Sequence, residues 1–281
     1  SPVAKLLMQC AVGALVFFGG LRLVFISWPF VEGGRLELGL LGLPITVFWF
    51  AGLMNAMNVI DGLDGLCSGI SAISSFVLAA IIMSFDATFF SVLPAITVGL
   101  CIGFLVHNYH PAMIFLGDTC SLLLGYLLAC STLTTGTKST AVLALLVPIL
   151  CIAVPVVDMA FAIVRRTSRG RHPFSADKEH IHHRLLGLGL SQTRVVWILW
   201  FLTAYLGMTG YTLEKVGSPF LILANAAFLF FGFLLLVENV SFLAVAREKE
   251  RSELETLRVE RTKSGGLEIL PAENLGTKQA T

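Results

Sequence analysis

Residues 66–84 read LCSGISAISSFVLAAIIMS, an apolar run without a charged side chain. A helix needs about 20 apolar residues to cross the roughly 30 Å hydrocarbon core of a bilayer, so this run predicts a membrane span. Similar runs predict about eight spans, at 6–26, 44–60, 66–84, 89–107, 119–135, 140–163, 194–213 and 218–243. We therefore expect an all-α polytopic membrane protein, with one short hairpin in the connection 27–43.

The composition of the whole chain fits a lipid environment. Of its 281 residues, 56% are hydrophobic and 13% are charged, whereas a soluble domain has about 25% charged residues. The net charge of +1 lacks the basic field of a nucleic-acid-binding protein, so we expect no nucleic acid as a partner. The six cysteines show no CxxC spacing, which favours buried thiols over disulfides or a zinc site.

Basic residues determine the predicted orientation of the spans. With Lys5 inside and the sides alternating at each span, most Lys and Arg residues fall in cytoplasmic segments. We expect residues 1–246 to form a transmembrane catalytic region and residues 247–281 a charged cytoplasmic tail. Three polar clusters then open on the cytoplasmic face, at 55–64, 107–118 and 177–184. Ionisable residues at span ends are costly and usually functional, so the clusters indicate a site.

The first cluster has the composition of a magnesium site. Asn55, Asn58 and Asp61 follow one another on one face of a helix, and Asp64 comes directly after them. Carboxylate and amide oxygens are hard ligands of the kind that Mg²⁺ accepts. The alternative is a helix end whose acids are only solvated, and the spacing favours the site.

The second cluster ends at the predicted start of a helix. Asp118 and Thr119 lie where free backbone N–H groups and the positive end of the helix dipole favour an anion. Either residue alone would be interpreted as a cap. Capping does not explain a second acidic cluster on the same face of the membrane, so Asp118 is kept as a site candidate.

The third cluster is rich in histidine and basic residues. Residues 177–184 read DKEHIHHR and follow four arginines within 165–171. A zinc site fits poorly, because no cysteine or ExxH pattern accompanies the histidines. Arg and protonated His form charge-assisted hydrogen bonds to phosphate oxygens, which favours a phosphate-binding loop. Acids for a metal, a basic loop and a membrane face together indicate phosphoryl transfer.

A transporter is the rival class, and it predicts polar residues near the middle of the bilayer. Here the polar clusters lie at span ends instead. Asp158 is the exception, since it lies about two turns inside its predicted span. Two roles stay open for it, support of the site from behind and a structural pair with a neighbouring helix.

Three strings resemble a known family. They are NAMNVIDGLDGL at 55–66, NYHPAMIFLGDTCSL at 108–122 and DKEHIHHRLL at 177–186. In sequence, order and separation they are similar to the polyprenyl-phosphate N-acetylhexosamine-1-phosphate transferases of glycosyltransferase family 4. The HIHHR form resembles the bacterial branch that transfers an N-acetylhexosamine-1-phosphate, GlcNAc-1-phosphate first among them, from UDP-GlcNAc or a related UDP-sugar to undecaprenyl phosphate. The resemblance implies a phosphotransferase that releases UMP, as the first membrane step of cell-wall or surface-polysaccharide synthesis.

The resemblance also implies roles for individual residues. Asn58 and Asp118 would ligate Mg²⁺, or Mn²⁺ in its place. The catalytic residues would be Asp61, Asp64, His180, His182 and His183. The substrate-binding residues would be Lys5, Asn55, Asn108 and Arg184. The protein would lie in the bacterial inner membrane with its active site on the cytoplasmic side, and a homodimer is a further expectation.

Two departures from the family pattern bear on activity. The family's adjacent Asp-Asp pair and further spans would precede Ser1, so we expect this chain to be a C-terminal fragment. Cys120 stands where the family mostly has Gly, and its small neutral thiol is expected to be tolerated. The alternative to an active transferase is a catalytically inactive truncated paralogue or scaffold.

Overall fold

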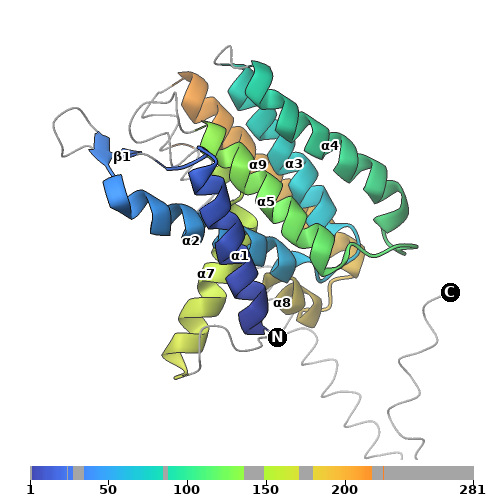
Figure 1. The fold of residues 1–281 in the computed structure, drawn as a ribbon. Coiled ribbons are helices and arrows are strands. Elements are labelled where there is room, and N and C mark those ends of the chain that lie inside the picture. Colours follow the sequence, from blue (N-terminus) through green and yellow to red (C-terminus); the bar gives the residue numbers. More distant parts are fainter. Residues whose placement is uncertain are drawn as a thin grey trace, which may run out of the picture. The chain divides into compact units, whose positions relative to one another are not determined.

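The computed structural model describes residues 2–23, 25–27, 35–84, 88–135, 149–170, 180–216 and 224 (Figure 1). The described helices are α1 (Pro2–Phe18), α2 (Gly42–Ile60), α3 (Leu66–Met83), α4 (Thr88–Asn108), α5 (Gly117–Thr135), α7 (Ala153–Ser168), α8 (Ile181–Gly187) and α9 (Gln192–Val216). All of them belong to one compact unit, Ser1–Ala226. The tail predicted at 247–281 lies outside the described residues, so its boundary stays a prediction.

A small hairpin joins α1 to α2. Strand β1 (Phe25–Ser27) pairs antiparallel with β2 (Arg35–Glu37), with Ile26 opposite Leu36. A short 3-10 helix, η1 (Gly39–Leu41), then leads into α2. The hairpin predicted for this connection is confirmed, and the all-α prediction holds for the rest of the described structure.

Among the described residues, four helical segments are long and apolar enough to cross a membrane. They are Gly39–Ile60, Leu66–Met83, Phe89–Asn108 and Gln192–Lys215. The apolar helix in α1, Val3–Phe18, is shorter, and α5 matches the predicted 119–135 without meeting the same criterion. The span predicted at 218–243 lies outside the described residues. Four of the predicted spans are thus supported by helix length and hydropathy, and the others stay predictions.

The described part of the span predicted at 140–163, residues 149–163, is not one continuous helix. The backbone at Ile152 is not helical, and α7 begins only at Ala153 and continues to Ser168. Pro155 explains the break, because proline has no N–H for the carbonyl of Cys151 and its ring would collide with that carbonyl. The Cys151 carbonyl accepts a hydrogen bond from the hydroxyl of Ser74 on α3 instead.

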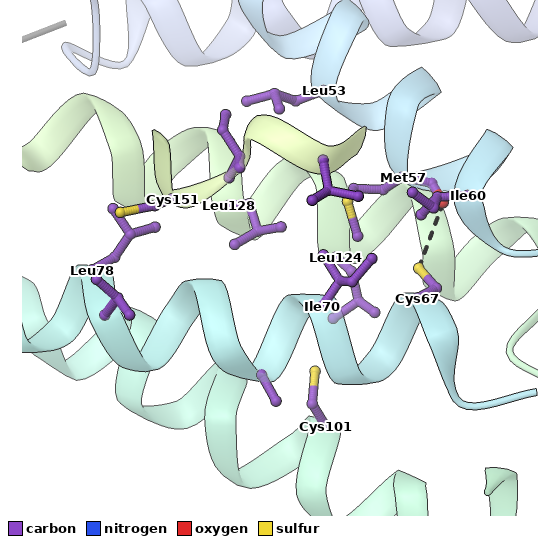
Figure 2. Close-up of a cluster of buried hydrophobic side chains, with 14 of the residues drawn as sticks. Leu53, Met57, Ile60, Cys67, Ile70, Leu78, Cys101, Leu124, Leu128 and Cys151 are labelled. Carbon is purple, nitrogen blue, oxygen red and sulfur yellow. Dashed lines mark hydrogen bonds between the residues drawn. The ribbon is translucent and has the colours of Figure 1, made fainter. Parts of the chain in front are cut away.

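The core is centred on α3, which packs against α4, α5 and α9. Figure 2 shows Met57 of α2, Ile70 of α3 and Leu124 of α5 gathered in one buried apolar cluster. Lipid tails are as apolar as these side chains, so helix association in a membrane depends on close packing and small residues. At Gly125 of α5 an added Cβ would overlap the backbone of α2 at Leu53 and Met54. This close contact brings the end of α2 beside the start of α5.

Candidate active site

The first cluster occupies the end of α2 and the turn that leads into α3. Asp61 follows the last residue of α2, and Gly65 precedes the first residue of α3 with φ +75. That left-handed conformation favours glycine, because a Cβ would be strained there. Gly62 is required for another reason, since an added Cβ would overlap the ring of His182. The structure therefore explains why both of these positions in the DGLDG string are glycine.

Lys5, Asn58 and Asp118 meet at the ends of three helices. The Lys5 ammonium donates to Asn58 Oδ1 at 2.7 Å and lies 3.0 Å from Asp118 Oδ2. Gly117 has φ +70, which lets the chain turn sharply into α5 and places Asp118 in its first turn. The Ser121 hydroxyl, one turn further along α5, also donates to Asn58 Oδ1, at 3.3 Å. One cation is thus shared between two oxygen ligands from different helices.

Asp61 is the third acidic or amide side chain in this group. Burial and, to a smaller extent, the nearby charge of Asp118 together raise the pKa of its carboxyl to about 6. Each cause disfavours a second negative charge beside Asp118 in the absence of a cation. The Asp118 side chain itself is 76% exposed, so a ligand can reach it from solvent.

The oxygens of Asn58 and Asp118 fit a hydrated magnesium ion. Both already lie within hydrogen-bonding distance of one positive charge, the Lys5 ammonium. Mg²⁺ usually keeps several waters and binds through one or two carboxylates together with substrate phosphates. Within the described residues no group of three His, Cys, Asp or Glu side chains could enclose a metal. The oxygens of Asn58 and Asp118 therefore suit an open site that a substrate completes.

Asn108 ties the turn after α2 to the segment between α4 and α5. Its Oδ1 accepts hydrogen bonds from the Gly65 N–H at 3.0 Å and the Ser68 hydroxyl at 3.1 Å. Its Nδ2 donates to the Ile114 carbonyl at 2.9 Å. The side chain is buried and makes contacts inside the protein from both ends of the amide. This geometry gives Asn108 a positioning role, and its predicted contact with substrate stays a prediction.

Asp64 also contacts the segment between α4 and α5. Its Oδ2 accepts a hydrogen bond from the Ala112 N–H at 3.2 Å and lies 2.8 Å from His110 Nδ1. Asp64 therefore pairs with the segment after α4, whereas Asp61 lies toward Asp118. The two acids of the DGLDG string have different partners, although the sequence suggests one shared cleft.

The histidines of the third cluster lie at the start of α8. His180 and His182 are buried, whereas His183 and Arg184 are exposed. His182 packs against Gly62 and so joins the third cluster to the first. Burial, with a smaller effect of His183, lowers the pKa of His182 to about 4. His182 is thus neutral near pH 7 in this state, and it can offer a phosphate one N–H but no charge.

Comparison with known proteins supports a family assignment. Residues 1–136 match the family model described as Glycosyl transferase family 4. The chain is 38% identical over 216 residues to a probable undecaprenyl-phosphate N-acetylglucosaminyl 1-phosphate transferase of Bacillus subtilis. That alignment covers 76% of this chain and 60% of the relative.

More distant relatives carry similar names. An undecaprenyl-phosphate alpha-N-acetylglucosaminyl 1-phosphate transferase of Escherichia coli O157:H7 is 32% identical, over 80% of this chain and 64% of its own length. A decaprenyl-phosphate N-acetylglucosaminephosphotransferase of Mycobacterium tuberculosis is 39% identical, over 57% of this chain and 44% of its own length. Over residues 1–136 the chain is similar to glycosyl transferase family 4. It spans less than two thirds of the length of each of these relatives.

The structure brings together most of the site residues predicted from sequence. Lys5, Asn58, Asp61 and Asp118 form one group, and His182 borders it through Gly62. Asn55 lies on α2 one turn before Asn58 and is half-buried. None of these positions by itself establishes a catalytic role.

Sequence reasoning missed two partners of the family 4 motifs. His110 was not singled out, and it pairs with Asp64. Asp158 was left between two roles, and it pairs with His180 at 3.1 Å. A carboxylate within an apolar run was the available signal for Asp158. No comparable signal marked His110, because its partner lies 46 residues away in the chain.

Proposed function

We propose that this protein transfers N-acetylglucosamine-1-phosphate from UDP-GlcNAc to undecaprenyl phosphate and releases UMP. The relatives named above for this chemistry support the proposal. The observation that carries it is the placement of Asn58 and Asp118 around the Lys5 ammonium, with Asp61 near enough for the charge of Asp118 to raise its pKa. Such a group of hard oxygen ligands suits a diphosphate substrate that arrives with a divalent ion.

The reaction is a displacement at phosphorus. An oxygen of the undecaprenyl phosphate attacks the sugar-side phosphorus of UDP-GlcNAc and forms a new P–O bond. The bond from that phosphorus to the bridging oxygen breaks, and the electron pair leaves with UMP. A phosphomonoester is already largely ionised near neutral pH, so the attacking oxygen needs no strong base. Positioning and charge neutralisation therefore supply most of the catalysis.

Each residue of the candidate site has its own proposed role in this reaction. Asn58 and Asp118 would hold Mg²⁺, or Mn²⁺ in its place, and the bound ion supplies neutralisation of the diphosphate charge. Lys5 is placed to pair with a phosphate oxygen, because its ammonium already lies at the group. Asp61 lies near Asp118 in the same group. Exposed Arg184 and His183 are available to the nucleotide, while His182 offers an N–H.

The wider setting is part of the same proposal. We place the site on the cytoplasmic side of the bacterial inner membrane, where both a soluble nucleotide sugar and a membrane lipid can reach it. The product would begin cell-wall or surface-polysaccharide synthesis. A homodimer stays a prediction.

The test uses protein purified from its full-length gene. UMP release is measured with UDP-GlcNAc, undecaprenyl phosphate and Mg²⁺, and again without lipid or with a metal chelator. We expect release that requires all three components and is lost in Asp118→Ala. Cys120→Ala, two residues along the same helix, is the matched control and should keep near-normal activity. The proposal fails if no UDP-N-acetylhexosamine yields UMP, or if Asp118→Ala releases it at the normal rate.

A further inference from the structure

Asp158 is a buried carboxylate for which the proposed reaction has so far no use. It lies in α7 and is 6% exposed. Its Oδ2 lies 3.1 Å from His180 Nδ1, and its Oδ1 accepts a hydrogen bond from the Ile181 N–H at 2.8 Å. A buried charge is costly unless it is paired and hydrogen-bonded, and Asp158 meets both conditions at the start of α8.

Helix α8 depends on this contact for its position. It has seven residues, and helices this short are marginal without tertiary support. The first N–H groups of a helix have no partner within it, and the side chain of His180 at the N-cap does not provide one. Asp158 accepts one of these N–H groups from a neighbouring helix instead, and its negative charge suits the positive end of the helix dipole.

The first turn of α8 leads directly to the candidate active site. The rings of His180 and His182 are nearly parallel, with an interplanar angle of 7° and centroids 6.1 Å apart. His182 in turn occupies the space beside Gly62, next to Asp61. A shift at His180 therefore moves His182 relative to the acidic group.

The pairing also fixes the tautomer of His180. An ionised carboxylate can only accept a hydrogen bond, so His180 Nδ1 carries the hydrogen. In the neutral ring Nε2 is then left as the acceptor. The charge of Asp158 also acts on His182. It raises the pKa of His182, whereas the larger effect of burial lowers that pKa.

We propose that Asp158 is a positioning residue of the active site, which acts through His180 to hold α8 and to present His182 beside the Asp61–Gly62 turn. This inference rests on the proposed function for its effect on activity. The contact itself is tested independently of turnover.

Asp158→Asn removes the negative charge of the side chain and keeps its size and shape. The amide oxygen can still accept from the Ile181 N–H, while the NH₂ group faces His180 Nδ1 and favours the opposite tautomer. We expect kcat for UMP release to fall about 10-fold to 100-fold, as for partners that orient an active-site histidine. The KM for UDP-GlcNAc and the melting temperature should change little. Val157→Ala, the adjacent exposed position on α7, is the matched control.

Two further readouts decide whether the effect passes through His180. In a double-mutant cycle, Asp158→Asn combined with His180→Ala should be no less active than His180→Ala alone. In ¹⁵N-histidine NMR spectra, the His180 signals, assigned by their loss in His180→Ala, should show the Nδ1–H form in the wild type and the Nε2–H form in Asp158→Asn. Independent, multiplying losses or an unchanged tautomer would overturn the inference.

The proposed function and this inference fail in different ways. If the wild type releases no UMP, the proposed function is wrong, and the NMR signature still decides whether Asp158 controls His180. If the wild type is active and Asp158→Asn keeps its kcat, the inference is wrong and the proposed function stands. Because Asp158→Asn retains the contact with Ile181, the test does not depend on whether Asp158→Ala folds.

Discussion

Gly62 leaves the space that the ring of His182 occupies, so Gly62→Ala tests the contact that joins the third cluster to the first. An added Cβ would overlap three ring atoms, Nε2, Cε1 and Cδ2. The ring has little room to retreat, since His182 is 1% exposed and the ring of His183 lies 4.3 Å from it between centroids. Extra methyl groups in a well-packed interior destabilise by about 1–3 kcal/mol. We expect Gly62→Ala to lower the free energy of unfolding by that amount.

The measurement is thermal or denaturant unfolding in detergent, with UMP release as a second readout. Gly103→Ala is the control, because Gly103 lies within α4 and a Cβ there meets nothing within 4 Å. Alanine should stabilise that position by roughly 0.5–1 kcal/mol, the difference in helix propensity. Gly62→Ala combined with His182→Ala should recover part of the lost stability. The contact is refuted if Gly62→Ala is as stable as the wild type, or if the double variant shows no recovery.

Three other results are expected. Asn108→Ala should lower the free energy of unfolding by about 1–3 kcal/mol, because it leaves the buried Gly65 N–H and the Ile114 carbonyl without their partner. Denaturant unfolding at fixed pH measures this loss. An unchanged unfolding midpoint would contradict the prediction. Lys5→Met should raise the affinity of the substrate-free protein for Mg²⁺ in calorimetric titration, since a competing cation is removed. The same variant should lower kcat/KM. Weaker Mg²⁺ binding would contradict the prediction that the ion and the Lys5 ammonium occupy the same position. The third concerns His182, whose pKa of about 4 lies below the ordinary 6.5. The unfolded chain then takes up a proton more readily, so the wild type should lose stability relative to His182→Gln as the pH falls from about 6.5 to about 4, and a constant difference would refute this.

The helices that position the site were predictable from apolar run lengths. The prediction 66–84 matches Leu66–Met83, and 44–60 matches Gly42–Ile60. In both segments the polar residues at one end mark where the apolar run stops. The helix break within 140–163 was not predicted, because hydropathy does not register backbone geometry and Pro155 interrupts the helix within an apolar stretch.

The membership of the site was predictable in part. The spacing of Asn55, Asn58 and Asp61 follows from helix periodicity, and α2 places them as expected. The partner of each acidic side chain was not predictable, because it depends on which chain segments meet in the fold. Asp61 and Asp64 look equivalent in the sequence, yet Asp64 bonds the segment after α4 while Asp61 lies toward Asp118.

The most direct test of the central claim follows the two phosphates of UDP-GlcNAc separately. The protein from the full-length gene is incubated with undecaprenyl phosphate, Mg²⁺ and UDP-GlcNAc that carries radiophosphorus in either the sugar-side or the uridine-side phosphate. We predict that the sugar-side label moves into the lipid fraction and the uridine-side label stays in soluble UMP. Recovery of both labels in soluble UDP would mean that only the sugar is transferred. That result, or labels that remain in UDP-GlcNAc, would contradict the account.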